Sequence, residues 1–179
     1  MIIIFVILGA VVLWLIWGFN SLVSFRNRAR EAASDIEVQE KRRYDLIPNL
    51  LETVKGYMVH EKGVFEQVTQ ARSRAMQSTG KEKNAAENML SGTLKSLFAV
   101  AENYPDLKAN TNFLDLQREL TDTEDKIQAA RRFYNANVRD LNTKIEIFPT
   151  NILAKIFNFT PMSFYDAEDA ASQPVSVKF

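Results

Sequence analysis

The residues of this chain best suited to metal binding or to acid–base catalysis are its single histidine, His60, and its carboxylates. The chain has no cysteine, so thiol nucleophiles, disulfides and zinc-thiolate sites are excluded. Zinc sites and the di-iron sites of helical bundles need several histidines or Glu-x-x-His pairs, but the residue three before His60 is Tyr57. We therefore predict no metal, and interpret His60 as a surface or groove residue or a single pH-sensitive contact.

Signatures of nucleophilic or nucleotide chemistry are missing from the sequence. There is no G-x-S-x-G elbow, and neither of the glycine-rich phosphate loops occurs. Many carboxylates are present, but nothing marks two that converge. Basic and acidic residues balance at 22 each, so no overall field favours nucleic acid. We predict no catalytic residue, no cofactor and no nucleic-acid partner, with an enzyme or ligand sensor as an unfavoured alternative.

An apolar run at the N-terminus would determine where in the cell any functional site of this chain is placed. Residues 1–17 carry no charge, and with residues 18 and 19 they approach the ~30 Å hydrocarbon core of a bilayer. No Lys or Arg precedes the run and no small-x-small cleavage site follows it, which favours an uncleaved anchor over a signal peptide. Trp14, Trp17 and Phe19 cluster at one end, as in an interfacial aromatic belt.

Basic residues directly after the anchor predict its orientation. Arg26, Arg28 and Arg30 lie within reach of anionic headgroups, and we predict that all three contact them. The positive-inside rule then places the N-terminus outside and the body of the chain in the cytoplasm.

The rest of the chain has helical periodicity. Apolar positions recur every three or four residues from Leu22 to Leu50, from Ile47 to Val68, from Ala86 to Ala101 and from Phe113 to Phe148. Pro48 predicts a break or kink near residues 46–48. We predict an all-α fold, in which a single N-terminal transmembrane helix precedes an antiparallel bundle of long helices. The predicted divisions are an anchor (1–19), a bundle (20–159) and a C-terminal tail (160–179).

Two surfaces are candidates for protein contacts. Leu22 and Phe25 continue the apolar stripe beyond the anchor, and we predict that they mediate self-association unless the bundle or lipid headgroups cover them. Arg43 falls on the same stripe, which favours a structural ion pair over a role in reading a partner. Gly56 and Gly63 share one face of the predicted second helix, where they allow a close neighbour or form a partner groove.

Two further segments are open to more than one interpretation. Tyr44 and Tyr104 lie in the strings RRYDLIP and ENYPDL, which we predict to be corners between helices, with the rings anchored in the core. Were these corners exposed and adjacent, Tyr104 would belong to a recognition surface. The apolar segment Thr150–Phe159 either fills the end of the bundle, lies in a membrane surface or meets another subunit.

Two long stretches resemble the LemA family of bacterial membrane-anchored proteins. They lie at residues 41–72 and 102–159 and contain the unusual strings RRYDLIPNL, ENYPDLKAN and RFYNANV. The resemblance implies a single anchor in the bacterial cytoplasmic (inner) membrane and a helical bundle, and it assigns no reaction. Some relatives take part in magnetosome formation. Members are often encoded near HtpX-type membrane zinc peptidases, which makes such a peptidase a partner by family association only.

Taken together, these features predict a non-catalytic, membrane-tethered helical scaffold or adaptor. We expect it to contact the lipid bilayer and to form a homo-oligomer. A membrane-shaping or membrane-sensing protein is the alternative, favoured if the apolar segment near the C-terminus inserts into lipid.

Overall fold

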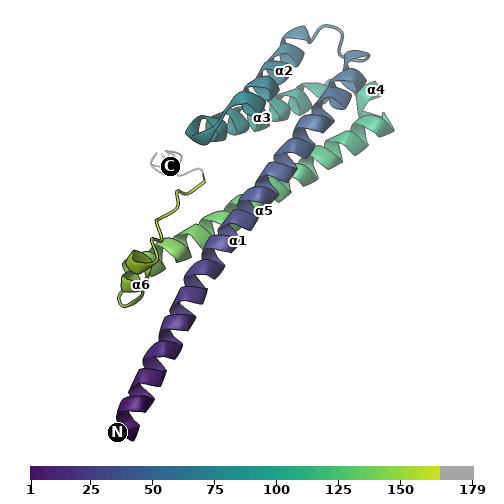
Figure 1. Cartoon of the computed structure of the whole chain (residues 1–179). Coiled ribbons are helices and arrows are strands. Elements are labelled where there is room, and N and C mark those ends of the chain that lie inside the picture. The colour runs from purple at the N-terminus through teal and green to yellow at the C-terminus, as the bar shows by residue number, and fades with distance from the viewer. Residues whose placement is uncertain (166–179) are drawn as a thin grey trace, which may run out of the picture. The chain divides into compact units, whose positions relative to one another are not determined.

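The computed structural model describes residues 1–165 of the chain (Figure 1). Helices make up 84% of these residues and no strand occurs among them, which confirms the predicted all-α fold. The helices are α1 (Ile2–Lys55), α2 (Lys62–Gln77), α3 (Gly80–Ala101), α4 (Pro105–Lys108), α5 (Thr111–Glu146) and α6 (Thr150–Ile156).

The first third of α1 fits a membrane anchor. Its most apolar 18-residue window is only 6% buried, although a core helix of similar composition would be mostly covered. Ile2 and Phe5 are 80% and 71% exposed. Apolar side chains exposed in this way fit a lipid environment, because exposing them to water is unfavourable.

The helix α1 does not end at Pro48, so of the predicted break or kink the break is wrong. It continues to Lys55 with Pro48 inside it. Proline has no amide hydrogen, so the carbonyl of Tyr44, four residues earlier, loses its helical partner. The side chain of Arg72 on α2 replaces that partner, since its Nε donates to the Tyr44 oxygen at 2.8 Å. Tertiary contact thus compensates for the missing donor, and RRYDLIP lies within a helix rather than at a corner.

Replacing Arg72 by methionine is expected to lower the free energy of unfolding by about 1–3 kcal/mol, because the Tyr44 carbonyl would lose its substitute donor. In a Pro48→Ala background the same replacement should cost less, since alanine restores the helical amide. Urea unfolding followed by circular dichroism measures both costs. Equal losses in the two backgrounds would show that Arg72 does not compensate for Pro48.

The chain forms two compact units. The bundle unit is Asp35–Ala129, and the anchor unit combines Met1–Ser34 with Ala130–Phe179. The bundle unit has a core drawn from α1 to α5, which includes Ile47, Val54, Val68, Leu97 and Leu120. The anchor unit has a separate core of Leu22, Leu141, Leu153, Ala154 and Phe159. The predicted division into anchor, bundle and tail stays a prediction.

The predicted second helix is wrong in its bounds, because α1 ends at Lys55 and α2 begins at Lys62. Gly56 lies one residue beyond α1, and Gly63 lies in the first turn of α2, so neither sits inside a long helix. The turn between them is closed by Met58, which is fully buried, and by the bond from the Glu61 amide to the Met58 carbonyl at 3.2 Å. A Cβ atom added at either glycine would meet nothing within 4 Å, so no neighbour approaches them closely.

Candidate functional site

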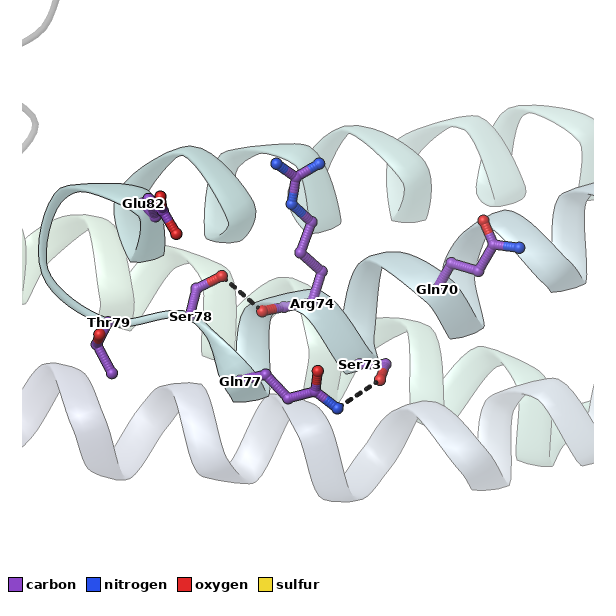
Figure 2. A pocket seen from close by; sticks show the side chains of 7 residues that line it. All are labelled: Gln70, Ser73, Arg74, Gln77, Ser78, Thr79 and Glu82. Atoms are coloured by element: carbon purple, nitrogen blue, oxygen red, sulfur yellow. Dashed lines mark hydrogen bonds between the residues drawn. The ribbon is translucent and has the colours of Figure 1, made fainter.

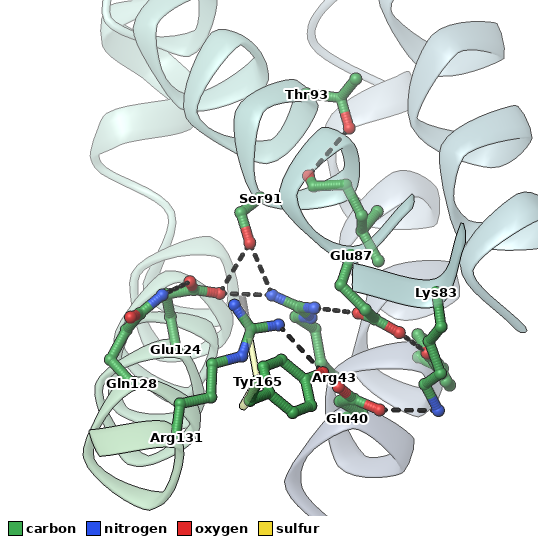
Figure 3. Close-up of polar contacts among 12 residues, drawn as sticks. Glu40, Arg43, Lys83, Glu87, Ser91, Thr93, Glu124, Gln128, Arg131 and Tyr165 are labelled. Carbon is green, nitrogen blue, oxygen red and sulfur yellow. Dashed lines mark hydrogen bonds and ion pairs between the residues drawn. The ribbon is translucent and has the colours of Figure 1, made fainter. Parts of the chain in front are cut away.

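A buried ion-pair network joins three helices of the bundle unit at Arg43, whose side chain is 1% exposed (Figure 3). Its guanidinium donates to Glu87 of α3 and Glu124 of α5, and its Nη1 also donates to Ser91 Oγ at 2.8 Å. The fully buried Glu87 accepts a further hydrogen bond from the Tyr44 hydroxyl. Pairing of this kind offsets the cost of removing charged groups from water.

Helical spacing explains why these side chains converge. The network residues are Glu40, Arg43 and Tyr44 on α1 and Lys83, Glu87 and Ser91 on α3. On α1, Arg43 and Tyr44 lie three and four residues after Glu40, and on α3 the three residues are spaced by four, so each helix presents its set on one face. Lys83 Nζ lies 2.8 Å from Oε2 of Glu40, which is itself 1% exposed. The Ser91 hydroxyl donates to Glu124 at 3.0 Å while it accepts from Arg43.

This geometry suits a structural role, in which the network fixes the register of the three helices relative to one another. Glu87 has both carboxylate oxygens engaged, one by Arg43 and one by Tyr44, so it is not available as a base. The sequence placed Arg43 correctly on the packed face but did not reveal its partners. One signal was present: Glu87 lies three residues before Leu90 and seven before Leu94, on the apolar stripe of α3. Arg43 is not a surface residue that could read a partner.

Alkaline pH is expected to destabilise the bundle unit through Tyr44. Burial raises the pKa of the Tyr44 phenol well above its usual value, and Glu87 and Glu40 raise it further, while Arg43 lowers it. The folded state therefore holds the phenolic proton more tightly, so this stabilisation is present below pH ~10, the unfolded value, and is lost as the pH rises above it. Tyr44→Phe should flatten the fall in unfolding free energy above pH ~10, measured by urea titration. An unchanged slope would contradict this assignment.

Two loops meet at one end of the bundle unit. The Tyr104 hydroxyl donates to Glu61 at 3.1 Å, and the side-chain amide of Asn110 donates to the Tyr57 hydroxyl at 3.0 Å. The turn after α1 is therefore pinned to the turns on either side of α4. Burial and the hydrogen bond to Glu61 raise the pKa of Tyr104. The ENYPDL corner forms as predicted, and Tyr104 packs against the core of the unit.

These pinned loops expose one aromatic and one aliphatic side chain beside a histidine. Tyr57 is 39% exposed and Val59 is 60% exposed, and His60 beside them is also exposed. Gly56 and Gly63 are exposed at the same turn. We call Gly56, Tyr57, Val59, His60 and Tyr104 the loop-end surface, from which the buried Met58 is left out. Of the predicted partner residues, Gly56 and Tyr104 belong to it, Gly63 lies three residues after His60, and Arg43 is buried elsewhere.

The residues that follow the anchor are placed differently from the prediction. Leu22 is fully buried in the core of the anchor unit, and Phe25 is half-buried, with its ring 5.6 Å from Lys144 Nζ. The exposed apolar surface that we expected here for self-association is therefore not found, because α5 and α6 cover Leu22 within one chain. Arg26 is half-buried over the ring of Phe159 at 4.7 Å.

The arginines after Arg26 keep the exposure that headgroup contact requires. Both Arg28 and Arg30 are exposed. Their contact with lipid headgroups remains a prediction, as does that of Arg26.

An asparagine pair on α5 holds the segment after α6, and the sequence analysis missed it. Asn142 exchanges two hydrogen bonds with the backbone of Met162, each 2.9 Å, and Asn135 exchanges two with Tyr165, each 2.8 Å. Seven helical residues and three extended residues both span about 10 Å, so the two registers match. Asn135 lies in RFYNANV, one of the strings on which the resemblance to the LemA family is based.

The hollows on the bundle unit do not gather catalytic groups. Figure 2 shows an open hollow of about 500 Å³ where α2 turns into α3, lined by polar side chains that include Arg74 and Glu82. A second hollow of about 360 Å³ lies between α3 and α5 and reaches Ser91 and Glu124 of the ion-pair network. Within residues 1–165, no three His, Asp or Glu side chains are arranged to hold a metal ion. Absence of metal and of catalysis stays a prediction.

Comparison with known proteins agrees with this architecture. A family model described as "LemA family" matches residues 32–179. "Protein LemA" of Metamycoplasma hominis is 29% identical over 155 residues, which cover 84% of this chain and 69% of the relative. "Magnetosome protein MamQ" of Magnetospirillum gryphiswaldense is 23% identical over 94% of this chain and 72% of its own length. Because the family model spans most of the chain, the protein belongs to the LemA family.

Proposed function

We propose that the protein is a non-catalytic, membrane-tethered helical scaffold or adaptor whose loop-end surface binds a protein partner. The observation that carries this proposal is the exposure of Tyr57 and Val59 on turns that hydrogen bonds hold in place. A preorganised surface loses little conformational freedom on binding, and aromatic side chains are common anchors at interfaces.

The polar residues of the interior support a structural rather than a catalytic role. The carboxylate of Glu87 and the guanidinium of Arg43 are buried and paired with each other. Such a network fixes the register of the three helices that carry it, as polar residues in packed seams do elsewhere. A scaffold needs this rigidity, because its partner surface must keep one shape.

Site-specific photo-crosslinking tests the loop-end surface. A photoreactive amino acid at Val59 should crosslink in native membranes to a discrete protein that mass spectrometry identifies. The matched control is Met89 on α3, which is 51% exposed but lies outside the loop-end surface. The same crosslinking pattern at both positions, or none at Val59, would contradict the proposal.

The proposed topology places the N-terminus outside and the body in the cytoplasm. In this Cys-free chain, Ser73→Cys on α2 should resist a membrane-impermeant thiol reagent in intact cells and react after permeabilisation. Ile2→Cys should react without permeabilisation, since Ile2 is 80% exposed at the other end of the anchor. The opposite labelling pattern would reverse the orientation.

We also propose that the protein self-associates and that a membrane peptidase is one of its partners. With Leu22 buried, we propose that copies contact each other through the exposed apolar side chains of the anchor. Light scattering of full-length protein in detergent measures the number of subunits, and a monomer would contradict the homo-oligomer. An HtpX-type membrane peptidase is one protein that the crosslinking experiment would identify.

A membrane-shaping or membrane-sensing role is the second candidate function. One relative bears the name of a magnetosome protein. The observation in this chain that favours such a role is the exposure of large apolar side chains near the end of the anchor, such as Phe148 at 78%. Apolar side chains that enter a membrane surface can respond to its curvature and lipid composition.

A further inference from the structure

The corner between α5 and α6 exposes large apolar side chains. These are Ile147, Phe148, Ile152, Ile156 and Phe157, which are 49%, 78%, 50%, 64% and 50% exposed. The opposite side of α6 is buried, since Leu153 and Ala154 belong to the core of the anchor unit. The short helix is therefore apolar on both sides but packed on only one. A cluster of this kind on a protein surface is normally covered by a partner or by lipid.

Packing contacts with α1 determine which residues of the anchor the corner lies beside. Gly18 lets Leu153 approach, because a Cβ atom at position 18 would lie 2.7 Å from the Leu153 side chain. The ring centroids of Phe19 and Phe157 are 4.7 Å apart, and Lys144 lies 5.1 Å from the centre of the Trp17 ring. The corner thus lies beside Trp17, Gly18 and Phe19, where the apolar run of α1 ends (Figure 1).

We propose that the α5–α6 corner is a second membrane contact, in which Phe148, Ile152 and Ile156 enter the lipid interface beside the anchor. An anchor of residues 1–19 places the level of Trp17 at the boundary between acyl chains and headgroups, where Trp is enriched. The exposed side chains of the corner then continue the lipid-facing surface of α1. We commit to lipid as the occupant because the corner packs directly beside the end of the exposed apolar run of α1, so that a bilayer around the anchor would reach it.

Charges at the corner fit this position. Lys144 and Lys155 lie within the corner together with Glu146. Long basic side chains at this depth can keep their apolar stems in the interface and extend their ammonium groups to phosphates. The inference depends on α1 being the anchor and is independent of the proposed scaffold role, because it concerns contact with lipid and not with a protein.

Spin labelling of the Cys-free chain tests the proposal. Full-length variants with a single nitroxide-labelled cysteine at position 148 or 156 would be reconstituted into vesicles of phosphatidylethanolamine and phosphatidylglycerol. The matched control is Phe133, which is 51% exposed on α5 in the same unit. It lies 11 residues before Lys144, or about 16 Å farther along the helix. Collision rates with oxygen, which dissolves in lipid, and with a water-soluble nickel chelate are then compared.

Labels at 148 and 156 should show an oxygen-to-nickel collision ratio several-fold higher than the label at 133. An equal ratio at the three positions would place the corner in water and overturn the proposal. Spectral broadening at 156 that disappears on dilution with unlabelled protein would show that a second copy covers the corner, which also overturns it. The labelled positions are at least half exposed, so substitution there should leave the fold intact. A label at Ile152, which is 50% exposed, repeats the measurement independently.

Discussion

Replacement of Arg43 by methionine is expected to lower the free energy of unfolding by about 3–5 kcal/mol. Methionine fills a similar volume without charge, so the loss comes from the partners that Arg43 leaves behind. Glu87 is fully buried and would keep the Tyr44 hydroxyl as a donor, while Glu124 would keep Ser91 and Gln128. An unpaired carboxylate in the interior is costly because neither water nor a cation stabilises its charge.

The neighbouring arginine provides the matched control. Arg42 pairs with Glu119 at 3.4 Å, and both side chains are about half exposed, at 44% and 51%. Arg42→Met should therefore cost at most about 1 kcal/mol. Urea unfolding of the full-length protein in detergent, followed by circular dichroism, measures both. Adding Glu87→Gln to Arg43→Met should recover part of the loss, because it removes the orphaned charge. Equal costs for Arg42 and Arg43 would contradict the buried network.

Replacement of Leu120 by alanine is expected to lower the free energy of unfolding by about 2–5 kcal/mol. Leu120 is 3% exposed on α5 and belongs to the core that α1 to α5 share in the bundle unit. Its removal takes three buried carbons from the core and leaves a cavity that long helices cannot easily close. The same unfolding measurement reports the loss.

An exposed apolar residue serves as the comparison for Leu120. Met89 on α3 is 51% exposed, so Met89→Ala should change the unfolding free energy by no more than about 0.5 kcal/mol. A cost for Leu120→Ala as small as that of Met89→Ala would mean that the core is not packed around α5. A loss of helix in Leu120→Ala before urea is added would show an effect larger than the one expected.

Helical periodicity predicted most of the elements because it is a local property of the chain. The stripe from Ala86 to Ala101 became α3, and the stripe from Phe113 became α5, which ends at Glu146 shortly before Pro149. The anchor was equally clear, since seventeen residues without charge suit only a very apolar environment.

Local rules failed where a distant residue changed their outcome. Pro48 predicts a break by itself, but Arg72 supplies the missing donor from another helix. Conversely, the stripe from Ile47 to Val68 looked continuous, although α1 ends at Lys55 before Gly56. The apolar spacing in the sequence can continue through a short turn when the buried faces of both flanking helices pack into the same core.

What the sequence determined by itself is the all-α fold, the apolar N-terminal run that fits a membrane anchor, and the packed face on which Arg43 lies. The tertiary structure alone decided which groups meet: Arg43 with Glu87, and Leu153 with Gly18. The physical reason is the range of the interactions. Helix formation depends on residues three or four positions apart, so a single segment reveals it. These ion pairs and packing contacts join residues more than forty positions apart, and many carboxylates could have served until folding brought Glu87 and Glu124 beside Arg43.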